Sequence, residues 1–337
     1  MRKKTLLFLL PLLLINKLVL AQDHLYSQFY NAPNYLNPAL NGQFNGDLRI
    51  NMIYRNQWTG LTGGLTYSTF SLDYTVPKLN GGIGLMVTKA SEGVAYLNKT
   101  SVSGIYSYSV TTNNTVLSFG LLAGITGRKI DSDKLVFSDQ IDPVAGIVPG
   151  LTSGSSAIGY TKYYFDAGAG LNLVSGNLMI GASAQHLDKP DESFTGVKSE
   201  LPMRLNANIS YKINIDRYSY DDDHAIIPSV VYYTQAKSRT YSAGAQYKYR
   251  GFNLGLWYRS YGKANNAVVL TLLLDLFSNR DTYDKLRVGV SHDSSVTGIS
   301  YGQAGGSTEG ALNYEITFPN RGAVPNQHVG NRCYDFY

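Results

Sequence analysis

The strongest constraint on this sequence is a regular two-residue alternation of apolar and polar side chains. Between residues 205 and 215 the alternation runs without a break, with Leu205, Ile209 and Ile213 among its apolar members. Similar runs cover residues 48–55, 241–250 and 285–291. Such alternation places one face of a β-strand in apolar surroundings and the other face in water. The chain is therefore predicted to be an all-β protein.

Fourteen strands of this kind are predicted, with boundaries good to about three residues. Most are longer than the usual strand of a soluble protein, and a tilted strand needs only about 9–11 residues to cross the hydrocarbon of a membrane. The stretch Val268–Leu276 alternates least and is a candidate for contact with protein on both faces. The predicted strands are 47–57, 65–76, 81–90, 98–110, 114–128, 161–174, 177–187, 202–215, 224–236, 239–250, 252–262, 265–277, 284–294 and 309–319.

A soluble β-sandwich alternates too, but three features favour a transmembrane barrel. The strands are long, their polar faces carry Asn, Gln, Ser, Lys and Arg, and the chain has 27 Tyr, which suits the aromatic girdles of membrane barrels. Closure of the sheet also removes edges that would leave backbone groups unpaired in lipid. We therefore predict a transmembrane outer-membrane β-barrel of about 14 antiparallel strands over residues 47–319.

The lengths of the predicted connections agree with this topology. The three longest, 129–160, 188–201 and 295–308, follow odd-numbered strands and so meet at one end of the barrel. Single-chain bacterial barrels have periplasmic termini, short periplasmic turns and long outer loops. We therefore expect the long connections outside and both termini in the periplasm. Three segments depart from this pattern: 216–223 would be a long periplasmic turn, and 237–238 and 263–264 would be short outer loops.

Residues 1–21 are predicted to be a cleaved signal peptide. They have a basic start (Arg2-Lys3-Lys4), a Leu-rich apolar stretch and a small last residue, Ala21. Four of the 29 Lys and Arg residues and none of the 24 Asp and Glu residues lie there, which leaves 25 cations against 24 acids. Nucleic acid is therefore not expected as a partner. The one cysteine, Cys333, allows no internal disulfide, so stability must come from burial or from lipid. Residues 320–337 are expected to form a loose C-terminal tail.

Three short blocks near the start of the mature chain resemble one known family. They read Tyr26-Ser27-Gln28-Phe29, then Asn37-Pro38-Ala39, then Arg55-Asn56-Gln57-Trp58. Together they are similar to the opening of the PorP/SprF family of type IX secretion system membrane proteins. Less distinctive similarities are Leu286–Asp293, Glu309 and the Cys333-x-x-Phe336 ending. The chain departs from the family at His24, where proline is usual, and in the length of 129–160.

This resemblance implies an outer-membrane protein of a Gram-negative bacterium that works with the type IX secretion apparatus. Family members are linked to the export and surface retention of particular large proteins, including gliding adhesins. The implied partners are outer-membrane lipid, a secreted cargo protein with a C-terminal sorting domain, and other components of the type IX secretion system.

The same blocks also have a physical interpretation. Arg55 alternates with the apolar residues of the first strand, so it faces the lumen and can pair with an acid there. Trp58 suits the membrane interface. Asn37-Pro38 predicts a turn that seats the pre-barrel segment 22–46 as a plug or lumen lining. A structural role is favoured over cargo contact for all ten signature positions: Tyr26, Ser27, Gln28, Asn37, Pro38, Ala39, Arg55, Asn56, Gln57 and Trp58.

The sequence contains no motif that supports a catalytic function. Ser291-His292-Asp293 and Gln185-His186 lie in no nucleophile motif. Asp221-Asp222-Asp223-His224 lacks the ligand spacing of a calcium loop and is interpreted as a solvated acidic turn. Glycine pairs such as Gly305-Gly306 indicate turns, because no helix follows them. We predict no catalytic, cofactor-binding or metal-binding residue, and no enzymatic activity.

Two other functions remain open at this point. One is an outer-membrane channel or transporter for a small, hydrophobic ligand, resembling the fourteen-stranded fatty-acid channels. The other is a soluble surface adhesin, which would fractionate away from membranes.

Overall fold

The computed structural model describes residues 23–61, 63–93, 97–112, 114–130, 135–148, 161–194, 197–215, 224–262, 266–276, 284–297, 301–318 and 336. Three features singled out in the sequence lie outside these residues: the signal peptide 1–21, the acidic run Asp221–Asp223, and Cys333 with the rest of 319–335.

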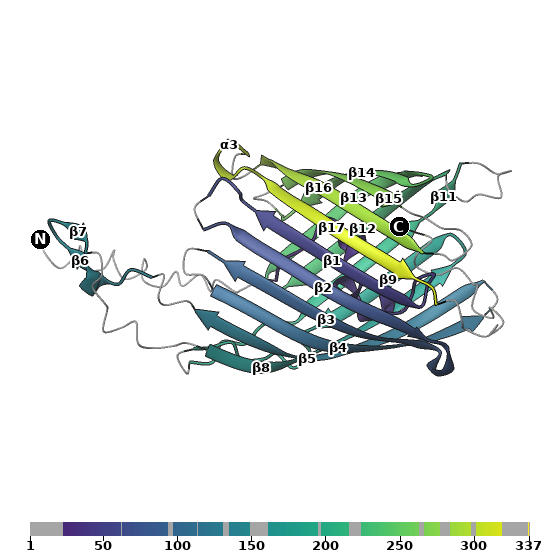
Figure 1. Cartoon of the computed structure of the whole chain (residues 1–337), viewed down its shortest axis with the longest axis horizontal. Coiled ribbons are helices and arrows are strands. Elements are labelled where there is room, and N and C mark those ends of the chain that lie inside the picture. The colour runs from purple at the N-terminus through teal and green to yellow at the C-terminus, as the bar shows by residue number, and fades with distance from the viewer. Residues whose placement is uncertain are drawn as a thin grey trace, which may run out of the picture.

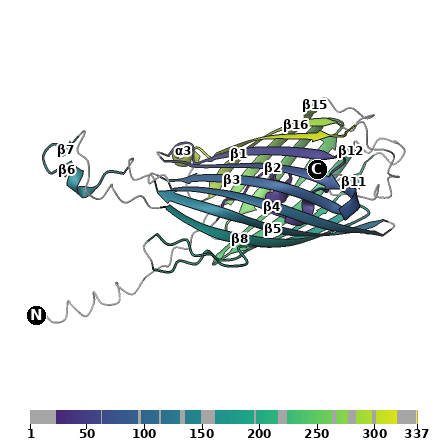
Figure 2. The same ribbon diagram turned by 60° about the horizontal axis from the view of Figure 1, so that its bottom comes forward.

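One antiparallel sheet closes on itself to form a barrel (Figures 1 and 2). The first strand pairs with the last, from Leu48 opposite Ile316 to Gln57 opposite Ser307. β11 continues β10 beyond Lys212, and both pair with β12, so the barrel has 14 strands. The barrel strands are β1 (Leu48–Gln57), β2 (Leu65–Val76), β3 (Gly81–Glu92), β4 (Leu97–Thr112), β5 (Thr115–Ile130), β8 (Thr161–Ser175), β9 (Leu178–Gln185), β10 (Arg204–Tyr211), β11 (Ile213–Asn214), β12 (His224–Gln235), β13 (Ser238–Tyr249), β14 (Phe252–Ser260), β15 (Asn266–Leu276), β16 (Lys285–Thr297) and β17 (Ser307–Ile316).

The predicted fold class is confirmed, and each barrel strand begins and ends within three residues of its expected bounds. The alternation explains this agreement, because it separates an apolar outer face from a polar lumen face. On β1 the outward Met52 and Tyr54 are exposed, whereas the lumen-facing Asn51 and Arg55 are buried. The outer face of the other strands is likewise rich in exposed Leu, Ile, Val and Tyr.

One expectation about a strand is wrong. The stretch Val268–Leu276 does not contact protein on both faces, because Leu270 and its outward neighbours are exposed. Its pattern is nearly all apolar because two lumen-facing residues, Val269 and Leu273, belong to a buried apolar cluster inside the barrel.

The two ends of the barrel differ in their connections. The end at the left of Figure 1, here called the long-loop end, carries the three longest predicted connections. They contain η6 (Ser138–Gln140) with the hairpin β6 (Ile141–Asp142) and β7 (Gly146–Ile147), the bridge Asp191–Glu200, and α3 (Tyr301–Ala304). The opposite, short-turn end carries tight turns such as η4 (Pro77–Leu79) and Gly176-Asn177.

Residues 23–46, here called the lumen segment, run through the inside of the barrel (dark purple in Figure 1). The segment contains η2 (Phe29–Asn31), α2 (Pro33–Leu36) and η3 (Pro38–Leu40). Every residue from 26 to 44 is buried. None of the helices in the described part of the chain is long and apolar enough to cross a membrane.

The lumen segment separates the two ends of the described chain. Asp23 contacts Lys99, His186 and Gln235, which all lie where strands meet the long-loop end. The last barrel strand instead ends at the short-turn end, where Phe318 N–H donates to Asp47 (2.7 Å). Residue 23 and the end of β17 thus lie at opposite ends of the barrel, because residues 23–46 run through the lumen before β1 begins. The expectation that both termini are periplasmic stays a prediction.

Candidate functional site

The first two sequence blocks belong to the lumen segment, and the third supplies Arg55 on β1. Arg55 on β1 and Arg259 on β14 contact Asp293 on β16 and Glu309 on β17, on one side of the barrel wall, and these four residues are here called the central anchor. Arg55 pairs with Glu309 and, at 2.9 Å, with Asp293. Arg259 pairs with the same Asp293 at 3.0 Å. Two guanidinium groups thus balance two carboxylates.

The central anchor also binds the backbone of the lumen segment. The N–H groups of Ser27 and Gln28 donate to the two oxygens of Glu309, at 2.6 and 2.9 Å. The Ser27 hydroxyl donates to Asp293 (2.6 Å) and accepts from Arg55 (2.8 Å). All of these groups are buried, so each charge is stabilised by its partner and not by water. Removing one partner of such a buried pair commonly lowers the free energy of unfolding by about 3–5 kcal/mol.

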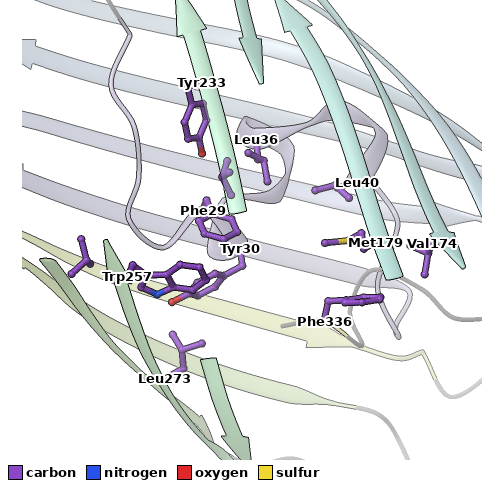
Figure 3. Packing of buried hydrophobic residues seen from close by; sticks show 12 residues of the cluster. Phe29, Tyr30, Leu36, Leu40, Val174, Met179, Tyr233, Trp257, Leu273 and Phe336 are labelled. Atoms are coloured by element: carbon purple, nitrogen blue, oxygen red, sulfur yellow. The ribbon is translucent and has the colours of Figure 1, made fainter. Parts of the chain in front are cut away.

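Apolar side chains of the lumen segment pack on both sides of the lumen. Phe29 and Tyr30 join Trp257 and Leu273 in one buried cluster, and Figure 3 shows the two rings close to Trp257. The ring centroids of Phe29 and Trp257 are 5.2 Å apart, edge to face. Tyr26, Ala32 and Tyr35 pack in a second cluster, against Ile53, Met86, Ile105 and Leu122 on β1, β3, β4 and β5.

The second block, Asn37-Pro38-Ala39, packs against the barrel wall where β5 and β8 have glycines in place of larger residues. Asn37 caps η3 by accepting from Ala39 N–H (2.9 Å), and its amide donates to the Leu171 carbonyl (2.8 Å). A Cβ on Gly120 would come within 2.2 Å of the Ala39 nitrogen, and one on Gly170 within 1.9 Å of the Asn37 side-chain oxygen. These two glycines face each other on β5 and β8, so the block fits only because both lack a side chain.

The rest of the third block lies near the long-loop end. Gln57 accepts from Arg55 Nε (3.3 Å) and lines a cavity there. Trp58 is half-buried, has a left-handed backbone (φ 60°) and donates its N–H to Gly306 O (2.8 Å). Asn56 is half-buried opposite Thr308. The structure therefore brings Ser27, Gln28 and Arg55 together, while Asn56 and Trp58 stand outside the central anchor.

A second group of charges, here called the mouth cluster, holds the start of the lumen segment at the long-loop end. Asp23 contacts His186 (2.5 Å), Lys99 (3.1 Å) and, more distantly, Arg204 (3.9 Å). Its N–H donates to Gln235 (2.8 Å). His186 also contacts Asp166, and Glu192 contacts Lys99 and Arg128.

Burial and charge act against each other in the mouth cluster. Burial alone would raise the pKa of the Asp23 carboxyl, but Lys99, His186 and Arg204 hold this pKa well below its ordinary value. Burial opposes charge on His186, yet Asp23 and Asp166 raise the pKa of His186 to about 9. Burial lowers the pKa of His24 to about 3, so this ring is neutral where it stacks between Tyr35 and Tyr67.

Sequence reasoning placed Arg55 in the lumen but missed most of its surroundings. It did not identify Asp293, Glu309 and Arg259 as partners, nor Gly120 and Gly170 as a seat for Asn37. A signal for the glycines was present, because glycine inside a strand often marks close approach of another backbone. Among the described residues, no group of three or more His, Cys, Asp or Glu side chains is arranged to hold a metal ion.

The closed antiparallel sheet, its apolar outer face and its polar lumen define a transmembrane β-barrel of the outer-membrane type. Residues 19–314 match the family described as "Type IX secretion system membrane protein PorP/SprF". The chain therefore belongs to the PorP/SprF family, and it is an outer-membrane barrel of a type IX secretion family. The expected family is thus confirmed.

Similar solved structures are also barrels. The monoaromatic hydrocarbon channel CymD is 14% identical, with a TM-score of 0.47, over 84% of this chain and 92% of that one. The toluene transporter TbuX of Ralstonia pickettii is 12% identical, with a TM-score of 0.48, over 86% and 94%. Omp33 of Acinetobacter baumannii is 8% identical, with a TM-score of 0.41, over 82% and 100%. A search of curated proteins finds no significant match. The barrel fold of this chain follows from its own strand pairings and not from these similarities.

Proposed function

We propose that this chain is the outer-membrane partner of one particular large protein that the type IX system exports or holds at the cell surface. The observation that carries the proposal is the burial of every residue from 26 to 44 against the barrel wall. A lumen that is occupied by the protein's own chain, and fixed there by the central anchor, leaves the loops and rims as binding surfaces. The lumen segment then acts as a plug.

The sizes of the cavities beside the lumen segment support this proposal over a channel for a small ligand. At the long-loop end, one cavity of about 160 Å³ lies beside Leu25, Tyr233 and Tyr261, and another of about 50 Å³ lies beside Met86 and Lys99. Sites for small organic ligands usually measure about 300–1,000 Å³. A hydrocarbon would therefore have to displace the segment to pass.

We place the long-loop end on the cell surface, because long connections of bacterial barrels lie outside. The β6–β7 hairpin is then the best candidate for cargo contact. It exposes Ile141, Val144 and Ile147, with Val144 96% exposed. Exposed aliphatic side chains gathered on one short hairpin are typical of a protein-binding site.

The test is a mild-detergent pull-down of the tagged full-length protein from its native outer membrane, followed by mass spectrometry. A large surface protein with a C-terminal sorting domain, or other secretion components, is expected in the eluate. A barrel without companions that takes up a hydrophobic ligand in liposomes would overturn the proposal in favour of a channel.

A matched pair of variants locates the contact. Val144→Ser combined with Ile147→Ser should remove the cargo from the eluate and leave the barrel folded. Val197→Ser changes another exposed valine, in a different connection at the same end (75% exposed), and should have no effect. Cargo retained by the double variant would exclude the hairpin as the contact.

A further inference from the structure

Neighbouring strands of the barrel reach different distances toward the long-loop end. β8 lies beside β5 at the bottom of Figure 1 and pairs with it along its whole length, up to Thr161 opposite Lys129. Its other neighbour, β9, already ends at Gln185, opposite Gly168. Residues 161–167 of β8 therefore have a paired strand on one side and none on the other.

The backbone at His186 explains why β9 stops there. His186 has a left-handed conformation (φ 58°), which does not continue a strand, and its side chain is held in the mouth cluster. The next residue, Leu187, still donates its N–H to the Ala167 carbonyl (3.0 Å), and the Asp188 side chain accepts from Ala167 N–H (3.3 Å). Beyond these two contacts the chain turns away from β8 into the lumen mouth, where Glu192 contacts Lys99.

The contacts of Ala167 show which backbone groups of β8 face the open side. Both its N–H and its C=O point away from β5, and this direction alternates from one residue of a strand to the next. The N–H and C=O groups of Phe165, Tyr163 and Thr161 therefore point to the same side as those of Ala167. Within the described ranges of the chain, no hydrogen bond reaches these groups on that side. Residues 161–165 are here called the β8 edge.

The side chains of the β8 edge leave its backbone accessible. Tyr163 is 71% exposed and Phe165 55% exposed. The Tyr163 ring leans over β5, because a Cβ on Gly127 would come within 2.8 Å of it. Lys162 lies on the lumen side, 3.6 Å from Asp191. Natural proteins commonly protect such an edge with charge, proline or a covering segment, whereas the outer face of this one carries two aromatic rings.

We propose that the β8 edge binds an extended peptide segment of the exported partner protein, which adds to the barrel wall as one more strand beyond the end of β9. This inference rests on the proposed function. It is supported by the connection that carries β6 and β7, the candidate cargo contact, since this connection leads directly into Thr161. Backbone hydrogen bonds provide the affinity. The pleat then favours a partner segment with apolar side chains beside Tyr163 and Phe165 and polar ones toward the mouth cluster.

Amide hydrogen exchange of the full-length protein, resolved to single residues by fragmentation and mass spectrometry, tests the edge itself. In the barrel alone, the amides of Tyr163 and Phe165 should exchange fast, while those of Tyr164 and Asp166, which point toward β5, should be protected. The bound partner should slow exchange at Tyr163 and Phe165 by about tenfold or more and leave the other two amides unchanged. Protection of Tyr163 and Phe165 in the barrel alone would overturn the proposal.

A matched pair of variants at one position separates the backbone from the side chain. Tyr163→Pro removes an N–H that faces the open side and keeps the ladder with β5, because proline is tolerated on the free side of an edge strand. Tyr163→Ala removes the ring and keeps the N–H. The amount of partner recovered in the pull-down should fall about tenfold in Tyr163→Pro and less than about threefold in Tyr163→Ala. Heat-dependent mobility in gels verifies that both variants are folded.

The outcomes distinguish this inference from the proposed function. If the wild type and Tyr163→Pro recover the same amount of partner, the edge is not the contact, although the proposed function stands. Equal losses in Tyr163→Pro and Tyr163→Ala would assign the contact to the ring and overturn strand addition. A wild type that recovers no partner would overturn the proposed function, and the inference with it.

Discussion

The lumen segment is held by two charged groups of different chemistry. In the central anchor, two arginines face two carboxylates, and both arginines are nearly inaccessible, with side-chain exposures of 2% and 3%. In the mouth cluster, Asp23 is held by a lysine and a histidine, and Lys99 is 22% exposed. Guanidinium stays charged even in alkaline solution, whereas His186 loses its charge as pH rises through about 9. The comparison indicates an attachment in the middle of the lumen that does not depend on pH and one at the long-loop end that weakens in alkaline solution.

The largest effect is expected at the central anchor. Arg55→Ala leaves Asp293 and Glu309 buried with one arginine between them, so the free energy of unfolding should fall by about 3–5 kcal/mol. Urea unfolding followed by the fluorescence of Trp257, in a Trp58→Phe background, measures this loss where the segment packs. Arg239→Ala, an exposed arginine at the long-loop end, is the control. Equal losses in both variants would mean that the central anchor is not special.

The mouth cluster should respond to pH. The pKa of His186 in the folded protein is about 9, above the ordinary 6.5. The contribution of protonated His186 to stability is therefore complete below pH 6.5 and is lost as pH rises through 9. The shift corresponds to roughly 3 kcal/mol at most. Unfolding free energies at pH 6.5 and 9 should show this decline in the wild type. His186→Gln should show a flatter pH dependence, and an unchanged slope would contradict the assignment.

The smallest effect is expected where the lumen segment packs on the glycines of the barrel wall. Gly120→Ala places a methyl group against the backbone of Pro38 and Ala39, and overpacking of this kind commonly costs about 1–3 kcal/mol. Gly104→Ala, on the outward face of β4, has room and should cost much less. Thermal unfolding of the two variants decides the point. If both lose the same stability, the wall glycines do not seat the segment.

The strands could be predicted from sequence because the two-residue alternation of apolar and polar side chains shows directly which face of a strand meets lipid. It also placed Arg55 in the lumen. Its partners could not be predicted, because Asp293 and Glu309 lie 238 and 254 residues away along the chain. Only barrel closure brings them to Arg55. The weak alternation at Val268–Leu276 was misleading, because Val269 and Leu273 on the lumen face pack in an apolar cluster with the lumen segment.

The path of the lumen segment was beyond prediction for a related reason. The turn at Asn37-Pro38 was foreseen, but turns do not reveal direction through a barrel. That direction follows from contacts made by Asp23 and from the side-chain-free seat on Gly120 and Gly170. The burial of Phe336 is of the same kind, since its sequence position gives no hint that it joins a cluster with Leu40, Val174 and Met179.

The position of the central anchor has a consequence for assembly. Arg55 and Glu309 stand directly opposite each other on β1 and β17, the pair of strands that joins the beginning of the barrel to its end. Contacts between such distant parts of a chain form late and slowly, because the intervening loop must first be closed. Glu309 also binds the backbone of residues 27 and 28. The ion pair that fixes the lumen segment therefore also fastens the seam, so closing the barrel and seating the segment depend on the same two side chains.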